Sequence, residues 1–159
     1  MGREHPVENG FLWHHTLGTP YLPGSSIKGM FRAWMIEQNG TEDSKTDSVN
    51  DKWFGSPEDG VGKYIFMDML PIYPPKLVVD FMTPHYGPYY QDAAIPGDWH
   101  DPVPIPFLAV DENCLWQTAV IPRNKDDDHT DLPELIDKLK EAFSILGAGA
   151  KTAIGYGRF

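Results

Sequence analysis

The chain has 159 residues, 41% of them hydrophobic, and a formal net charge of −10 at pH 7. This length suits a single domain over residues 1–159, and the apolar fraction is enough for a core. No stretch approaches the roughly 20 consecutive apolar residues of a membrane-spanning helix, so we expect no membrane partner. One cysteine, Cys114, excludes an internal disulfide and fits a reducing compartment. We therefore expect a soluble, cytoplasmic protein.

The acidic charge argues against indiscriminate nucleic-acid binding, because that affinity comes from neutralising phosphates. Eight of the 23 carboxylates lie in two runs, 41–51 and 124–131, which we interpret as solvated loops, the first of them flexible. Basic residues with few acids nearby in sequence lie elsewhere, and they are Lys28, Arg32, Lys151 and Arg158. A local phosphate site is therefore compatible with the overall charge.

The N-terminal third is expected to contain a strand over residues 11–16, a turn, and then a helix. Ser25 or Ser26 is suited to cap that helix, and Asn39-Gly40 to end it. Apolar residues follow at helical spacing and predict one buried stripe: Ile27, Met30, Phe31, Trp34 and Met35. Lys28 and Arg32, four residues apart, share a different face of the helix.

The middle of the chain favours strands. Residues 61–70 and 76–83 have strand composition, and 105–110 and 114–121 are expected to pair with each other around Asp111-Glu112-Asn113. The segment between the strands 76–83 and 105–110, residues 84–104, contains five prolines and four aromatic residues. It is too irregular for regular structure and too aromatic for a disordered linker, so we interpret it as a long packed loop with a functional or interface role.

The clearest prediction is a second helix that begins after Asp131. Asp131 and Glu134 have capping-box spacing, and Gly147 is placed to end the helix in the left-handed conformation. The expected apolar stripe is Leu132, Leu135, Ile136, Leu139, Phe143 and Leu146. A last strand is predicted over 153–159. Helices separated by strand pairs indicate an α+β fold with an antiparallel sheet of the split-βαβ type, an architecture shared by common RNA-recognition modules.

The chain ends in "GAGAKTAIGYGRF", with four glycines in thirteen residues. A mononucleotide P-loop is disfavoured, because Ile145 and Ala150 stand where that motif needs glycine and these glycines follow a helix instead of opening one. Backbone amides in a glycine-rich turn could instead form an anion-binding nest helped by Lys151, which suits a grip on a sugar-phosphate backbone. The alternative, a helix C-cap followed by tightly packed small residues, stays open.

Three segments together resemble a known family: "PYLPGSSIKGMFRAW" (20–34), "DFMTPHYGPYY" (80–90) and the glycine-rich end (147–159). They are similar to the RAMP superfamily of CRISPR-associated proteins, and within it to the family of sixth subunits of type III-B (Cmr) effector complexes. The resemblance covers most of the chain outside the acidic loops, and the glycine-rich end alone would be a weak signal.

The resemblance implies a ferredoxin-like, RRM-related split βαβ sandwich with a glycine-rich C-terminal loop. It implies a non-catalytic subunit that holds the 3′ portion of the guide RNA (crRNA), can lie near target RNA, and packs against other Cmr/RAMP subunits in antiviral defence. No catalytic residue, metal or cofactor carries over. The implied RNA-binding residues are Ser25, Ser26, Lys28, Arg32, Gly147, Gly149, Lys151, Thr152, Gly155, Tyr156, Gly157 and Arg158.

The family usually has a longer N-terminal region with a first strand, whereas only Met1-Gly2-Arg3 precede "EHPVENG" here. We therefore expect the sheet to lack that strand, either because the form is shortened or because a partner fills the gap. An unpaired sheet edge could also pair with a second copy of the chain. The long loop is expected to contact neighbouring subunits through His85, Tyr86, Tyr89 and Tyr90; base stacking and loop anchoring are the other uses of these rings.

Two other classes of function stay open. One is a RAMP endoribonuclease, using His14, His15 or His85 as general acid or base, or Asp68 or Asp80 for metal-dependent cleavage. His100-Asp101 with Asp98 matches no metal motif. The other is a structural scaffold without RNA contact. For Ser25 and Ser26 simple N-capping, and for Lys28 and Arg32 a solvated helix face, are the corresponding structural interpretations.

Overall fold

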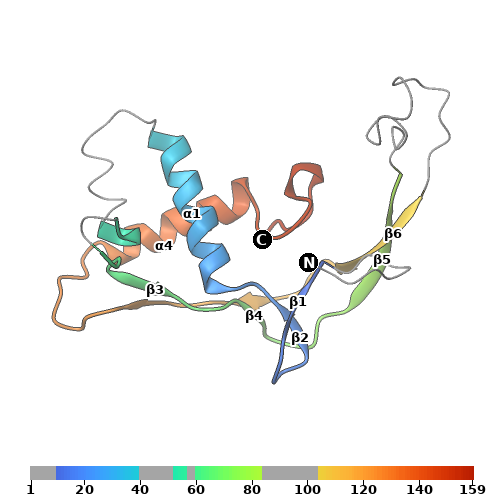
Figure 1. The fold of residues 1–159 in the computed structure, drawn as a ribbon, viewed down its shortest axis with the longest axis horizontal. Helices are drawn as coiled ribbons and strands as arrows, with labels where there is room; N and C mark the ends of the chain where they lie inside the picture. Colours follow the sequence, from blue (N-terminus) through green and yellow to red (C-terminus); the bar gives the residue numbers. More distant parts are fainter. Residues whose placement is uncertain (1–9, 40–51, 57–59, 84–103) are drawn as a thin grey trace. The chain divides into compact units, whose positions relative to one another are not determined.

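The computed structural model describes residues 10–39, 52–56, 60–83 and 104–159 (Figure 1). The chain divides into two compact units. Unit 1 comprises residues 1–20 and 71–115, and unit 2 comprises residues 21–70 and 116–159. The expectation of one domain over 1–159 stays a prediction. In the described ranges no helix combines the length and apolar character needed to cross a bilayer.

The described strands and helices form a small mixed α/β fold with antiparallel strand pairs, as predicted at that level. In chain order they are β1 (Leu12–His14), β2 (Thr19–Tyr21), α1 (Gly24–Asn39), β3 (Tyr64–Phe66), β4 (Leu70–Pro71), β5 (Leu77–Met82), β6 (Ile105–Val110), β7 (Trp116–Gln117), β8 (Val120–Pro122), α4 (Leu132–Ile145) and the 3₁₀ helix η1 (Thr152–Ile154).

The strands pair two by two: β1 with β2, β3 with β8, β4 with β7, and β5 with β6. The expected pairing of 105–110 with 114–121 is therefore wrong. After β6 the chain does not form a hairpin with the segment that follows. Its backbone continues to pair with residues that precede β5. The Asp111 amide donates to the Lys76 carbonyl at 2.9 Å, and the Ile72 amide to the Leu115 carbonyl at 2.8 Å. The partners of the second segment are consequently β4 and β3.

In unit 1, β5 and β6 form an antiparallel ribbon in which Leu77 pairs with Val110 and Met82 with Ile105. Successive side chains of a strand point to opposite faces. On one face Phe107 and Ala109 are buried, whereas Val79 and Phe81 on the other are 51% and 62% exposed. The ribbon is thus apolar on both faces but buried on only one.

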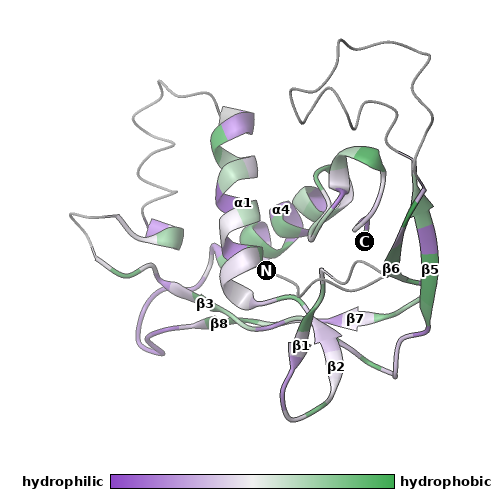
Figure 2. Ribbon diagram, turned by 45° about the vertical axis from the view of Figure 1, so that its right-hand side comes forward, coloured by the Kyte–Doolittle hydropathy of each residue, from purple (hydrophilic) through white to green (hydrophobic). Residues whose placement is uncertain are grey.

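In unit 2, α1 packs its apolar stripe into the core. Ile27, Phe31, Trp34 and Met35 are buried and Met30 is partly buried, which confirms the predicted face. The Phe31 ring lies 6.2 Å from that of Phe66 on β3. Figure 2 shows hydrophobic and hydrophilic residues alternating around this helix.

The start of α1 differs from the prediction. The helix begins at Gly24, one residue before Ser25, and the Gly24 amide donates to Asp68 Oδ1 at 2.7 Å. A Cβ at position 24 would collide with the Phe66 carbonyl. Glycine therefore lets the helix start approach the end of β3, and the carboxylate of Asp68, not a serine, satisfies the first donor.

The second predicted helix is α4, and its stripe is confirmed. Leu135, Leu139 and Phe143 are buried, and Leu132, Ile136 and Leu146 pack against the same core. Gly147 follows the helix with φ +72°, as expected for a left-handed C-terminal position. The capping box is wrong, since Asp131 is the N-cap residue but its side chain makes no cap hydrogen bond.

The predicted last strand over 153–159 is also wrong. Thr152–Ile154 form the 3₁₀ helix η1, followed by turns. The physical reason is that Gly155 and Gly157, both inside the predicted strand, have φ +101° and +67°. An extended strand needs negative φ at each residue, so these two positions exclude it.

Candidate nucleic-acid interface

The glycine-rich end is a closed loop whose base consists of two close backbone approaches. The Ala148 amide donates to the Gly157 carbonyl at 2.8 Å. A Cβ on Gly147 would lie 2.6 Å from the Gly157 carbonyl oxygen, and a Cβ on Gly157 would collide with the Ala148 carbonyl. Both glycines also have positive φ. Gly147 and Gly157 are therefore required to close the loop. This agrees with the alternative that the sequence left open, a helix C-cap followed by tightly packed small residues.

The other two glycines face open space. Gly149 and Gly155 both have φ +101°, and a Cβ on either would meet nothing within 4 Å. Within the described part of the chain, the amides of Gly149 and Ala150 donate to no acceptor. Exposed amides beside left-handed residues are the elements of an anion-binding nest. The tip of the loop, 149–155, thus has open space and amide donors for a ligand, whereas the base is filled by its own backbone contacts.

Lys151 lies at this tip in the left-handed conformation, with φ +62° and ψ +27°. That conformation costs a residue with a Cβ roughly 1 kcal/mol. Thr152 and Tyr156 are partly buried on either side of Gly155. The loop therefore holds a lysine where glycine would be energetically preferred.

Arg158 and Phe159 anchor the far side of the loop to α4. Arg158 Nη1 donates to the Ser144 carbonyl at 3.4 Å, where a cation also interacts favourably with the helix C-terminus. The Phe159 ring lies 5.4 Å from that of Phe143 and 6.1 Å from that of Trp116. Arg158, predicted to bind RNA, thus has a structural contact as well.

Three cations gather on another part of unit 2. Lys28 and Arg32 lie on one face of α1, and Arg123 follows β8 directly. Partial burial lowers the pKa of Lys28, and repulsion from the Arg123 and Arg32 guanidinium groups lowers it further. The sequence did not single out Arg123, because it adjoins the acidic run 124–131. Ser25 and Ser26, in the first turn of α1 before Lys28, are exposed.

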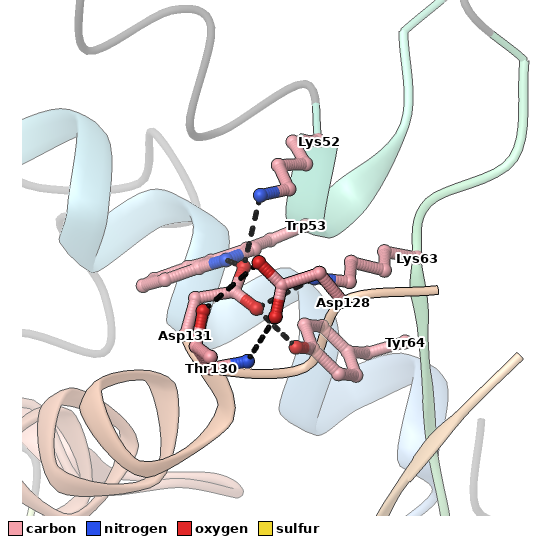
Figure 3. Close-up of polar contacts among 7 residues, drawn as sticks. All are labelled: Lys52, Trp53, Lys63, Tyr64, Asp128, Thr130 and Asp131. Carbon is pink, nitrogen blue, oxygen red and sulfur yellow. Dashed lines mark hydrogen bonds and ion pairs between the residues drawn. The ribbon is translucent and has the colours of Figure 1, made fainter. Parts of the chain in front are cut away.

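A polar network that the sequence did not predict surrounds Asp131 (Figure 3). Asp131 Oδ1 accepts from Lys63 Nζ and Tyr64 Oη, each at 2.6 Å, and Oδ2 accepts from Trp53 Nε1 at 2.8 Å. Lys52 Nζ lies 3.5 Å from Oδ2. These contacts join residues 52–53 and 63–64 to the start of α4, so the network connects distant segments of unit 2.

The network shifts the pKa values of its members. Partial burial acts to raise the pKa of Asp131, but hydrogen bonds from Lys63, Tyr64 and Trp53 outweigh it and hold that pKa well below its usual range. Burial and the hydrogen bond to Asp131 raise the pKa of Tyr64 to about 12. Burial lowers the pKa of Lys63, but its bonds to Asp131 and Tyr64 prevail and raise it. Such shifts accompany a stabilising ion pair as readily as an active site.

Three of the candidate enzymatic residues accept backbone hydrogen bonds. His14 Nδ1 accepts from the Leu17 amide at 3.3 Å, and Asp80 Oδ1 from the Phe81 amide at 2.8 Å. His15 is exposed, and Asp68 holds the start of α1. Among the described residues no three His, Cys, Asp or Glu side chains are grouped to hold a metal.

Several predicted residues lie outside the described ranges. They are the expected interface residues His85, Tyr86, Tyr89 and Tyr90, together with Asp98, His100, Asp101 and the acidic run 41–51. The predictions about them stay predictions.

With this geometry in place, comparison with known proteins decides the family. The sequence profile of the RAMP superfamily matches residues 1–159. The chain belongs to the RAMP superfamily. Its resemblance to that superfamily, inferred above from three segments, is thus confirmed over the full length.

Two curated relatives are Cmr6 subunits of CRISPR Cmr systems. The Cmr6 subunit of Pyrococcus furiosus is 29% identical over 221 aligned residues, covering 99% of this RAMP chain and 63% of the relative. The Cmr6 subunit of Saccharolobus solfataricus is 26% identical over 157 residues, covering 96% of this chain and 48% of the relative. The chain therefore spans about half to two thirds of the length of these relatives.

Two solved structures share the fold. The crystal structure of Cmr6 from Pyrococcus furiosus is 30% identical, with a TM-score of 0.50 over 89% of this chain and 82% of that one. A chain in the cryo-EM structure of the type III-B Cmr-β complex bound to cognate target RNA has a TM-score of 0.70 over 93% of this chain and 47% of that one. At 23% identity, the second likeness concerns the fold alone.

Proposed function

We propose that this RAMP chain is an RNA-binding subunit of a type III-B Cmr complex, without catalytic residues of its own. It holds the 3′ portion of the guide RNA and packs against other Cmr/RAMP subunits, with its elements arranged as in a ferredoxin-like domain. Similarity to Cmr6 over 99% of the chain supports the assignment to a Cmr complex. The proposed role includes a soluble cytoplasmic location and no cofactor, and pairing of a sheet edge with a second copy of the chain stays open.

The observation that carries the RNA-binding part is the tip of the C-terminal loop. Open glycines at 149 and 155 flank Lys151, and the amides of Gly149 and Ala150 are free within the described part of the chain. Backbone amides and one ammonium group bind phosphates without reading bases. A guide-holding subunit needs such contacts, because guides differ in sequence.

The acidic remainder of the chain fits this role. With a net charge of −10, most of the surface repels nucleic acid, so attraction is confined to the few positions where cations dominate. This favours one path for one RNA strand over scattered binding.

The binding test uses variants of the loop tip. Lys151→Ala should weaken retention of a labelled single-stranded RNA equally for different sequences and reduce the salt dependence of binding. Lys140→Ala is the matched control, since this exposed lysine on α4 carries the same charge and is paired with Asp137. Equal effects of the two variants would contradict the proposal in favour of a scaffold role.

The endoribonuclease alternative is tested with the same RNA. Incubation with the purified chain should leave the RNA intact. If the RNA is cut and either His85→Ala or Asp80→Ala abolishes cutting, the non-catalytic proposal fails.

A further inference from the structure

We propose that Arg123 completes a three-cation site with Lys28 and Arg32 that binds adjacent phosphates of an RNA backbone. This inference rests on the proposed RNA-binding function and adds a second contact to the C-terminal loop. All three residues belong to unit 2.

The first support is the backbone geometry that fixes Arg123. The β3–β8 ladder pairs Tyr64 with Pro122, and it continues when the Arg123 amide donates to the Lys63 carbonyl at 2.8 Å. Arg123 Nε also donates to the Gly62 carbonyl at 3.0 Å. The guanidinium group is therefore held at the end of the ladder, while its two terminal nitrogens bond to none of the residues that the structure describes. A guanidinium group that is already fixed in position loses little conformational entropy when it binds a phosphate.

The second support is the position of α1 over the same ladder. Gly24 lies against the Phe66 carbonyl, and the Phe31 ring packs near that of Phe66. Lys28 is one turn after Gly24, and Arg32 is one turn further along the same face. The helix thus carries both cations alongside the strand pair that ends in Arg123.

The third support is that the charges of these cations are not neutralised within the described part of the chain. No carboxylate there forms an ion pair with Lys28, Arg32 or Arg123. Asp68, an acid at the start of α1, accepts from the Gly24 amide. Repulsion from both guanidinium groups contributes to the lowered pKa of Lys28. Like charges gathered without acids disfavour the free protein and favour binding of an anion.

The ligand chemistry follows from the number and kind of the donors. Two guanidinium groups and an ammonium group match the oxygens of successive phosphodiesters, which are the same in every RNA sequence. The site should therefore bind RNA of any sequence, and it should do so by releasing counterions.

The test measures RNA affinity by fluorescence anisotropy over a series of salt concentrations, with a short unstructured single-stranded RNA as probe. Arg123→Gln in the 159-residue chain should weaken binding about fivefold near 0.1 M salt and lower the slope of log K against log salt by about 0.7, the value for one single-strand phosphate contact. Lys125→Gln is the matched control, because it removes the same charge from an exposed residue two positions away. It should change affinity less than twofold.

Arg123→Lys separates charge from structure, since it keeps the cation but loses the Nε bond to Gly62. It should retain the wild-type slope, whereas a role in folding alone predicts that both Arg123 variants weaken binding alike with an unchanged slope. Circular dichroism melting of each variant shows whether it is folded. In addition, Arg123→Gln should raise the pKa of Lys28 in the RNA-free protein, measured by NMR.

The outcomes distinguish the two proposals. If Lys151→Ala weakens RNA binding but Arg123→Gln behaves as Lys125→Gln does, the three-cation site is overturned and the proposed function stands. If the wild-type chain binds no RNA, both are overturned. A loss at Arg123 that depends on RNA sequence would overturn phosphate binding in favour of base recognition.

Discussion

The amide of Ala148 donates a 2.8 Å hydrogen bond to the carbonyl of Gly157, which closes the C-terminal loop at its base. This contact brings the two backbones so close that a Cβ on Gly157 would collide with the Ala148 carbonyl. Gly157 also has φ +67°. The loop can therefore present its tip only while this position has no side chain.

Gly157→Ala should lower the free energy of unfolding by about 3 kcal/mol, because it combines left-handed strain with a backbone collision. Gly149→Ala is the control. It has the same kind of strained φ, but its Cβ would meet nothing within 4 Å, so it should cost only about 1 kcal/mol. Chemical denaturation measures both. Equal losses would mean that the close approach to Ala148 does not exist in solution.

Asp131→Ala should lower the free energy of unfolding by about 3–5 kcal/mol, because it leaves the buried ammonium of Lys63 unpaired. The Lys63 side chain is 8% exposed and that of Asp131 is 18% exposed. Asp137→Ala removes an ion pair with Lys140 whose side chains are 77% and 72% exposed, and should cost under about 1 kcal/mol. Similar values for the two variants would argue that solvent screens the Asp131 network.

The same network should make stability depend on pH at both ends of the range. The folded pKa of Asp131 is depressed, so its contribution is present above the unfolded value near 4 and is lost as pH falls below it. The folded pKa of Tyr64 is raised to about 12, so stability should also decline as pH rises from about 10 towards 12. Urea midpoints against pH measure this. Asp131→Asn should flatten the acid limb, and an unchanged acid limb would assign it to other carboxylates.

Asp68→Ala should lower the free energy of unfolding by about 1–2 kcal/mol, because the Gly24 amide loses its acceptor at the start of α1. Asp68→Asn retains an oxygen acceptor and should cost less. Thermal melting compares the stability of the two variants, and incubation with RNA measures whether either one cleaves it. If Asp68→Asn leaves stability intact and abolishes an RNA-cleaving activity, Asp68 is catalytic and the capping role is secondary.

The helices could be predicted from sequence because each has a complete local signal. The stripes of α1 and α4 follow helical spacing, and Gly147 ends α4 as its position after the last apolar residue predicts. Such patterns depend on residues within one or two turns, so no distant contact is needed to interpret them.

Pairing and capping could not be predicted, because their partners lie far away in sequence. Asp131 has capping-box spacing, yet its carboxylate binds Lys63, 68 residues earlier. Gly24 is capped by Asp68, 44 residues later. In the candidate site the loop and the two cations of α1 were predicted. Arg123 was missed because it adjoins an acidic run and because its position depends on the β3–β8 ladder, whose strands lie far apart in sequence.

Lys151→Gly separates the stability of the loop from its function. At φ +62° glycine avoids the strain that a lysine pays, so this variant should raise the free energy of unfolding by roughly 0.5–1 kcal/mol. The same change removes the ammonium group at the loop tip, so RNA affinity should fall about fivefold near 0.1 M salt, with a slope lower by about 0.7. Denaturation and anisotropy on one preparation measure the two effects.

Opposite signs of the two effects are the decisive feature. If Lys151 served folding alone, its replacement should not make the protein more stable. If Lys151 did not contact RNA, its replacement should not change the salt dependence of RNA binding. Lys151→Ala, which keeps the strain and removes the charge, should reproduce the affinity loss without the gain in stability. If Lys151→Gly gained stability and kept full RNA affinity, the phosphate contact would have to be assigned to the backbone amides of the loop alone.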